Sequence, residues 1–130
     1  MSDYFGTSIN ESPTIILPAS EKITEARGMA MVIKDSGLAK PEAGDVVTGI
    51  SLMTNEDTLE AGDEATIQVK DIGKWKASGT IAVGDLLATD ASGLAAKATS
   101  GQFVVAQALS AAAKKGTLVK VQIIKAGYAK

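Results

Sequence analysis

The chain has 130 residues, of which 13 are Lys or Arg and 15 are Asp or Glu, giving a net charge of −2. A chain of this length buries about two-thirds of its unfolded surface, so we expect one domain that needs no disulfide or metal for stability. Because it contains no His and no Cys, it lacks the usual zinc ligands, a thiol nucleophile and an imidazole base. We therefore expect no enzyme activity, no metal and no cofactor.

The first 22 residues are predicted to form an extended arm, because they show no periodicity that would support a core of their own. Asp3 stands where a signal peptide has a basic residue, and no segment approaches the ~20 apolar residues that cross a bilayer. Apolar side chains on such an arm are explained if another protein covers them. The predicted protein-binding residues are Tyr4, Phe5, Ile15, Ile16 and Leu17.

An internal repeat occupies residues 23–130, which we predict to be a single duplicated domain with copies at about 28–69 and 84–123. Three pairs of segments align: 28–39 with 84–95, 46–47 with 104–105, and 67–69 with 121–123. Their offsets are 56, 58 and 54 positions. The changes in offset fall in predicted loops, where insertions cost little.

Both copies carry the pattern of β-strands. In the first copy Ala65, Ile67 and Val69 alternate with polar residues, and residues 119–123 repeat this alternation in the second. Segments rich in Val, Ile and Thr lie between Gly, Asp and Ser clusters at spacings of about 8 to 12 residues. The sequence thus predicts an all-β fold, a small barrel or sandwich built from two pseudo-symmetric repeats, with little helix.

Trp75, the only Trp, lies between the two copies and is flanked by Lys74 and Lys76. It has two interpretations, a binding platform or an indole packed on the core, and the second is favoured because large aromatic side chains are mostly buried. The nearby acidic segment 55–64 lacks the ligand spacing of a calcium loop. We interpret that segment as a solvated loop.

Charge is distributed unevenly along the chain. Residues 1–90 carry all 15 acids and seven basic residues, a net charge of −8, whereas residues 91–130 carry six lysines and no acid. One hypothesis is that the basic part meets an acidic surface on a partner. The alternative is that solvated lysines protect strand edges from aggregation. The candidate electrostatic contacts are Lys114, Lys115, Lys120 and Lys125.

The order of motifs over residues 23–124 resembles the capsid cement, or head-decoration, proteins of tailed bacteriophages. The segments that carry the resemblance are Gly28, Val46–Ile50, Leu59–Val69, Ile72–Ala77, Ile81–Leu87, Ser92–Gly93, Val104–Val105 and Ala111–Ile124. The resemblance implies a non-enzymatic virion protein, made in the host cytoplasm, that decorates and stabilises the outer surface of an assembled capsid. It also implies the major capsid protein as partner and a homotrimer as the assembled form.

Two other functions fit a small β-domain with an arm. One is a receptor- or glycan-binding accessory module on a viral or cell surface. The other is a carrier domain that presents a modified lysine, Lys74 or Lys76, near the junction of its halves. Nucleic-acid binding is not expected, because the chain has one Arg, few aromatic residues and an acidic overall charge.

Overall fold

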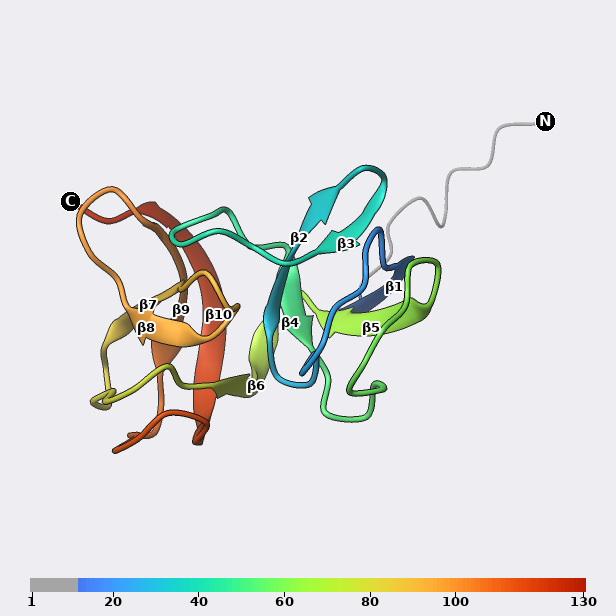
Figure 1. Ribbon diagram of the computed structural model, residues 1–130. Helices are drawn as coiled ribbons and strands as arrows, with labels where there is room; N and C mark the ends of the chain where they lie inside the picture. Colours follow the sequence, from blue (N-terminus) through green and yellow to red (C-terminus); the bar gives the residue numbers. More distant parts are fainter. Residues whose placement is uncertain (1–11) are drawn as a thin grey trace, which may run out of the picture.

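The computed structural model describes residues 12–130, which form ten β-strands and no helix (Figure 1). This confirms the predicted all-β fold. The strands are β1 (Thr14–Pro18), β2 (Ala30–Lys34), β3 (Gly37–Ala39), β4 (Gly49–Ser51), β5 (Glu64–Gln68), β6 (Asp71–Lys76), β7 (Leu86–Thr89), β8 (Ala95–Lys97), β9 (Phe103–Ala108) and β10 (Leu118–Tyr128).

The strands form two five-stranded antiparallel sheets that lie side by side (Figure 1). The first sheet has the order β1-β5-β4-β2-β3, and the second has the order β6-β10-β9-β7-β8. Each strand of the second sheet therefore takes the place that the strand five positions earlier takes in the first. Neither sheet closes into a barrel, and the arrangement is that of a small sandwich. We call residues 12–70 the first half and residues 71–130 the second half.

Part of the predicted arm belongs to the first sheet. Strand β1 pairs with β5 in antiparallel register from Thr14 opposite Gln68 to Pro18 opposite Glu64. Residues 14–18, within the segment predicted to be an extended arm, therefore form an edge strand of the first sheet. Strand β1 occupies the place in the first sheet that β6 occupies in the second. The sequence does not show this equivalence, because the two strands share almost no side-chain identity.

The pairing also changes the alignment of the two halves. Ile50 pairs with Gln68 of β5, and Gln107 pairs with Gln122 of β10. Gln68 and Gln122 occupy equivalent positions in the two halves. Ile50 and Gln107 therefore correspond at an offset of 57, one less than the 58 predicted from the Val-Val dipeptides, and Val47 corresponds to Val104. In a strand, a slip of one residue exchanges the two faces. The structural offset places both of these valines in buried positions.

Each half has its own hydrophobic cluster, and the second cluster joins the halves. The first cluster contains only residues of the first half, among them Ile23, Leu59 and Ile67. The second cluster surrounds Trp75 and also takes in residues of the first half. These are Ala30, Val47 and Ile50. The two halves thus share core packing along a seam.

Trp75 is fully buried at this seam, and its Nε1–H donates a hydrogen bond of 2.9 Å to the carbonyl oxygen of Gly93. The Gly93 carbonyl also accepts the Ala30 N–H at 2.8 Å, so one backbone group joins the indole to the first half. Gly93 has φ +79°, and a Cβ there would lie 2.4 Å from the Met29 Cγ. The site requires glycine, and the indole is not available as an exposed binding platform.

Candidate interaction surfaces

The apolar residues predicted to bind a partner through the arm are separated by the structure. Ile15 and Leu17 are half-buried on β1 and pack against the first hydrophobic cluster. Ile16 points to the other face of the sheet, where 61% of its surface is exposed. Tyr4 and Phe5 lie outside the described residues. Among residues 12–130, Ile16 is therefore the member of this set that remains open to a partner.

The four candidate lysines do not share one environment. Lys114 and Lys115 are exposed in the connection before β10, and Lys120 is exposed on β10 itself. The Lys125 Nζ instead donates a hydrogen bond of 2.8 Å to the Thr48 carbonyl oxygen in the first half. Burial lowers the pKa of Lys125. This lysine therefore joins the two halves and has less freedom than the others to meet a partner.

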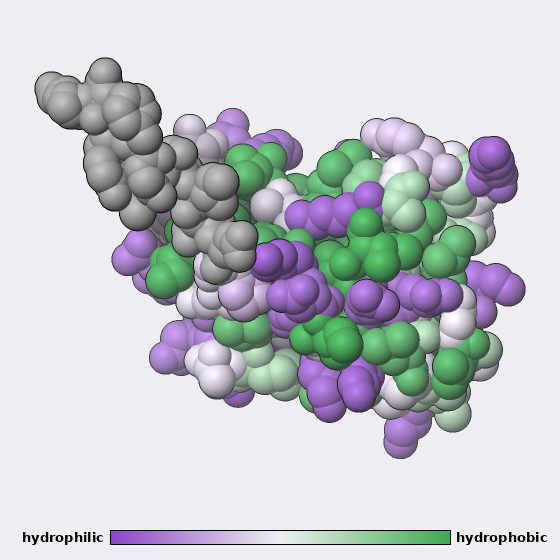
Figure 2. Space-filling view, turned by 180° about the vertical axis from the view of Figure 1, so that it is seen from behind, coloured by the Kyte–Doolittle hydropathy of each residue, from purple (hydrophilic) through white to green (hydrophobic). Residues whose placement is uncertain are grey.

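The second sheet presents a basic and apolar surface, which we call the β6–β10 face. Cross-strand neighbours lie on the same side of a sheet. The pairs on this face are Leu118 with Lys76, Lys120 with Lys74, and Gln122 with Ile72. None of these six residues is acidic. From behind, green and purple side chains interleave over the molecular surface (Figure 2), so apolar groups reach solvent between polar ones.

Lys74 and Lys120 stand directly opposite each other on the β6–β10 face. Like charges at directly opposite positions destabilise an antiparallel pair. Both side chains are exposed, and among residues 12–130 no carboxylate lies within 4.0 Å of either ammonium group. The arrangement therefore costs folding free energy. These positions also bear on the carrier-domain hypothesis. Lys74 and Lys76 both lie within strand β6, which pairs with β10, and neither lies in a turn.

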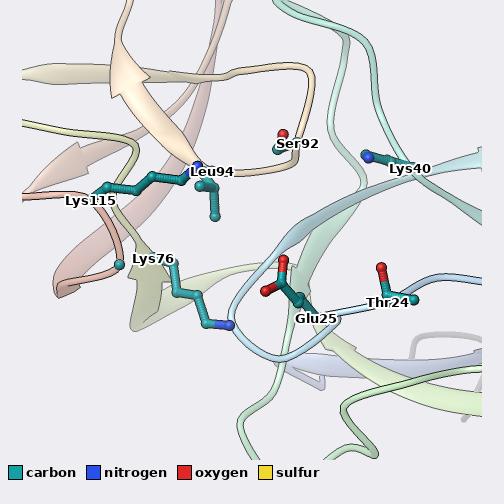
Figure 3. A pocket seen from close by; sticks show the side chains of 8 residues that line it. Thr24, Glu25, Lys40, Lys76, Ser92, Leu94 and Lys115 are labelled. Atoms are coloured by element: carbon teal, nitrogen blue, oxygen red, sulfur yellow. The ribbon is translucent and has the colours of Figure 1, made fainter.

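A pocket of about 330 Å³ opens between the two halves (Figure 3), and we call it the seam pocket. Its lining comes from Thr24, Glu25 and Lys40 of the first half and from Lys76, Ser92, Leu94, Lys115 and Gly116 of the second. The sequence analysis named Lys76 for the carrier-domain hypothesis and Lys115 as a candidate electrostatic contact. Nothing in their spacing along the chain predicts that they lie near Lys40. Only the packing of one half on the other brings these residues together.

The acidic segment 55–64 is held in place by hydrogen bonds from its own side chains. The Asn55 side chain bonds the N–H and C=O groups of Thr66 and the Ser51 hydroxyl, so it holds the loop to β5. Asp63 accepts the Glu60 backbone N–H at 2.9 Å. Within the described part of the chain, no three acidic residues are grouped to hold a metal ion, and no helix is long and apolar enough to span a membrane.

No protein-family model matches the sequence, and no curated protein resembles it. The structure, in contrast, is similar to the crystal structure of the N base of the head fiber protein gp8.5 of bacteriophage phi29. The TM-score is 0.64 at 18% sequence identity, and the match covers 90% of this chain and 97% of that one. At this identity the likeness establishes a shared fold over almost the whole of both chains.

Proposed function

We propose that the chain is a non-enzymatic structural protein of a tailed-phage virion, which decorates the outer surface of the assembled capsid and stabilises it. The observation that carries the proposal is the match in fold to a phage head fiber base over nearly the full length of both chains. The order of motifs over residues 23–124 led to the same expectation from the sequence. In this proposal the partner is the major capsid protein.

Stabilisation of a capsid requires no catalysis. A ligand that binds the assembled lattice better than free subunits stabilises the lattice by mass action. We further propose a homotrimer, because three linked copies bind a symmetric lattice far more tightly than one copy when all can engage together. The outer surface of the virion is then where the protein acts.

The β6–β10 face is the surface that we propose for attachment. Lys74 and Lys120 repel each other across the strands, and Ile72 beside them is more than half exposed. An acidic, partly apolar surface would relieve the repulsion and cover the exposed aliphatic side chains. A partner surface must match both the charge and the apolar area of this face, which would make the attachment specific.

The test uses expanded, undecorated heads assembled from the major capsid protein of the same phage. The full chain is mixed with these heads, and the particles are imaged by cryo-electron microscopy. We expect ordered density on the outer surface with the wild type and loss of that density with the Lys74→Glu, Lys120→Glu double variant. Lys97→Glu with Lys130→Glu, which changes the net charge equally, is expected to attach as the wild type does.

Three results would contradict these proposals separately. Heads that stay bare with the wild-type protein would refute capsid decoration, and micromolar binding to a glycan array in the same preparation would favour the accessory-module function. Attachment that survives the double variant undiminished would leave decoration standing and remove the β6–β10 face as its contact. Sedimentation of the free protein at the monomer mass at micromolar concentration would contradict the homotrimer.

A further inference from the structure

The seam pocket carries an excess of positive charge. Three lysines and one glutamate line it, together with the hydroxyl groups of Thr24 and Ser92. In Figure 3, Lys76 points toward Glu25 from the opposite half, and Lys40 points toward Ser92. The lysines come from three separate segments of the chain, so their meeting is a property of the fold.

These lysines have no ion-pair partner in the described part of the chain. The ion pair found among residues 12–130 joins Lys22 to Glu60 at 3.8 Å, outside the pocket. Glu25 therefore lies more than 4.0 Å from each of the three ammonium groups, and the pocket has a net charge of +2 from the side chains that line it. Like charges gathered in one concave site repel each other unless an anion joins them.

Backbone hydrogen bonds fix the positions from which the lysines extend. The Lys76 N–H donates to the Gly28 carbonyl at 3.0 Å, and the Gly116 N–H, next to Lys115, donates to the Ala77 carbonyl at 2.8 Å. The Lys40 N–H donates to the Glu21 carboxylate at 3.0 Å. The backbone around the pocket is therefore ordered in the free chain, so the entropy lost when a ligand binds comes mainly from the lysine side chains.

A second hollow in the molecule provides a contrast. It is lined by Val32, Ile33, Lys34, Lys40, Glu42, Asp45 and Val46, so its two lysines face two carboxylates. That hollow is electrically balanced and offers no preference for an anion. Lys40 lines both hollows, so the excess charge that is specific to the seam pocket comes from Lys76 and Lys115, which face the single carboxylate of Glu25.

We propose that the seam pocket binds the carboxylate side chains of an acidic peptide segment of the partner protein, a proposal that rests on the proposed function and names the chemistry of its contact. Lysine ammonium groups are compact point charges suited to carboxylates. The volume of about 330 Å³ lies at the small end of the range for ligand sites, which fits side chains of a short segment. Among residues 12–130, no aromatic side chain lines the pocket to hold a sugar ring, and Trp75 is fully buried.

The first test titrates the full chain with an acetylated, amidated hexapeptide of alternating aspartate and glutamate. The control ligand is a hexapeptide of asparagine and glutamine. We expect saturable shifts of the Ser92, Leu94 and Gly116 amide signals with the acidic peptide alone. We also expect the affinity to fall as salt is raised, because a Debye length of about 8 Å at physiological ionic strength screens partly exposed charges.

Matched variants assign the effect to the pocket. Lys40→Gln, Lys76→Gln and Lys115→Gln together are expected to weaken peptide binding by about 10-fold or more, since each exposed pair contributes a modest amount. Lys74→Gln, Lys97→Gln and Lys120→Gln remove the same charge, two of them from the β6–β10 face to which Lys76 also belongs, and are expected to change the affinity by less than about 2-fold. Glu25→Gln, which removes the one acid, is expected to tighten binding and serves if the pocket triple variant fails to fold.

Each contrary outcome has its own meaning. Equal loss in both triple variants would show attraction by net charge alone and overturn the proposal. Saturable binding of a heparin-derived disaccharide without binding of the peptide would assign the pocket to an acidic glycan and overturn it also. If the wild type attaches to heads and the pocket triple variant attaches equally well, the pocket proposal fails while capsid decoration stands.

Discussion

The two sheets have the same strand order but use the same face in different ways. A row of paired residues crosses four strands in each sheet: Thr14, Gln68, Ile50 and Ala30 in the first, and Ile72, Gln122, Gln107 and Leu86 in the second. Ile50 and Ala30 are buried in the shared cluster, with 2% and 0% of their surface exposed. Leu86 is 45% exposed.

The same strand order therefore carries a partly buried row in the first sheet and an exposed row in the second. In the first sheet Ile50 and Ala30 of this row lie in the seam that binds one half to the other, whereas in the second sheet the row is largely open to solvent. The change needs only side-chain substitutions at the equivalent positions, because the backbone pairing stays the same. Ile72 and Gln122 of the open row belong to the β6–β10 face, so this face of the second half is exposed to solvent.

The largest expected effect is at Trp75. Its replacement by Ala removes a fully buried indole and the hydrogen bond to Gly93, and we expect a loss of about 3 to 5 kcal/mol of unfolding free energy. Leu17 holds the equivalent place in the first sheet but is half-buried, so Leu17→Ala is expected to cost about 1 kcal/mol. Urea unfolding followed by circular dichroism compares the two. Equal losses would contradict the difference in burial.

The second prediction concerns the row itself. Ile50→Ala removes packing from the seam and is expected to cost about 2 to 4 kcal/mol. Gln107→Ala at the equivalent position in the open row removes a hydrogen bond of 3.2 Å to the Gly84 carbonyl oxygen and is expected to cost no more than about 1 kcal/mol. Thermal unfolding measures both. If the Gln107 variant were as unstable as the Ile50 variant, the row in the second sheet would not be open to solvent.

Gly93 gives a third prediction. Gly93→Ala combines a left-handed backbone with a Cβ that meets the Met29 side chain and the Ala30 carbonyl. Gly101 has φ +84° with nothing within 4 Å of its would-be Cβ, so Gly101→Ala measures the backbone strain alone, about 1 to 2 kcal/mol. We expect Gly93→Ala to cost about 1 to 3 kcal/mol more than that. Chemical unfolding of the pair would refute the steric argument if the two losses were equal.

Substituting Lys120 tests the repulsion on the β6–β10 face. Lys120→Glu converts the like-charged pair with Lys74 into an opposite one, and we expect it to raise the unfolding free energy by about 0.2 to 1 kcal/mol at low salt. The gain should shrink in 1 M salt, where charges are screened. Lys97→Glu is the control and should give no such gain. A destabilised Lys120→Glu variant would show that the pair does not repel.

The sequence alone predicts the class of the fold well and its seam poorly. Alternation in residues 65–69 and 119–123 indicates strands because it reports the local burial of alternate side chains. The strand at residues 14–18 was missed, since an edge strand that shares almost no identity with its counterpart has no local mark of equivalence. The seam pocket was missed for a different reason. Lys40, Lys76 and Lys115 become neighbours only through the packing of one half on the other.

The smallest effect is expected from pH, through Lys125 at the seam. Burial lowers its pKa below the ordinary value of 10.5, so between the lowered value and 10.5 the unfolded chain binds more protons than the folded one. Unfolding free energy from this group therefore rises with pH across that window, and below it the penalty for burying the charge is fully present. Lys125→Met is expected to lose this rise, while Lys97→Met keeps it. Unfolding measured from pH 7 to 10 separates the two variants, and parallel curves would mean that the Lys125 amine is as well solvated in the folded chain as in the unfolded one.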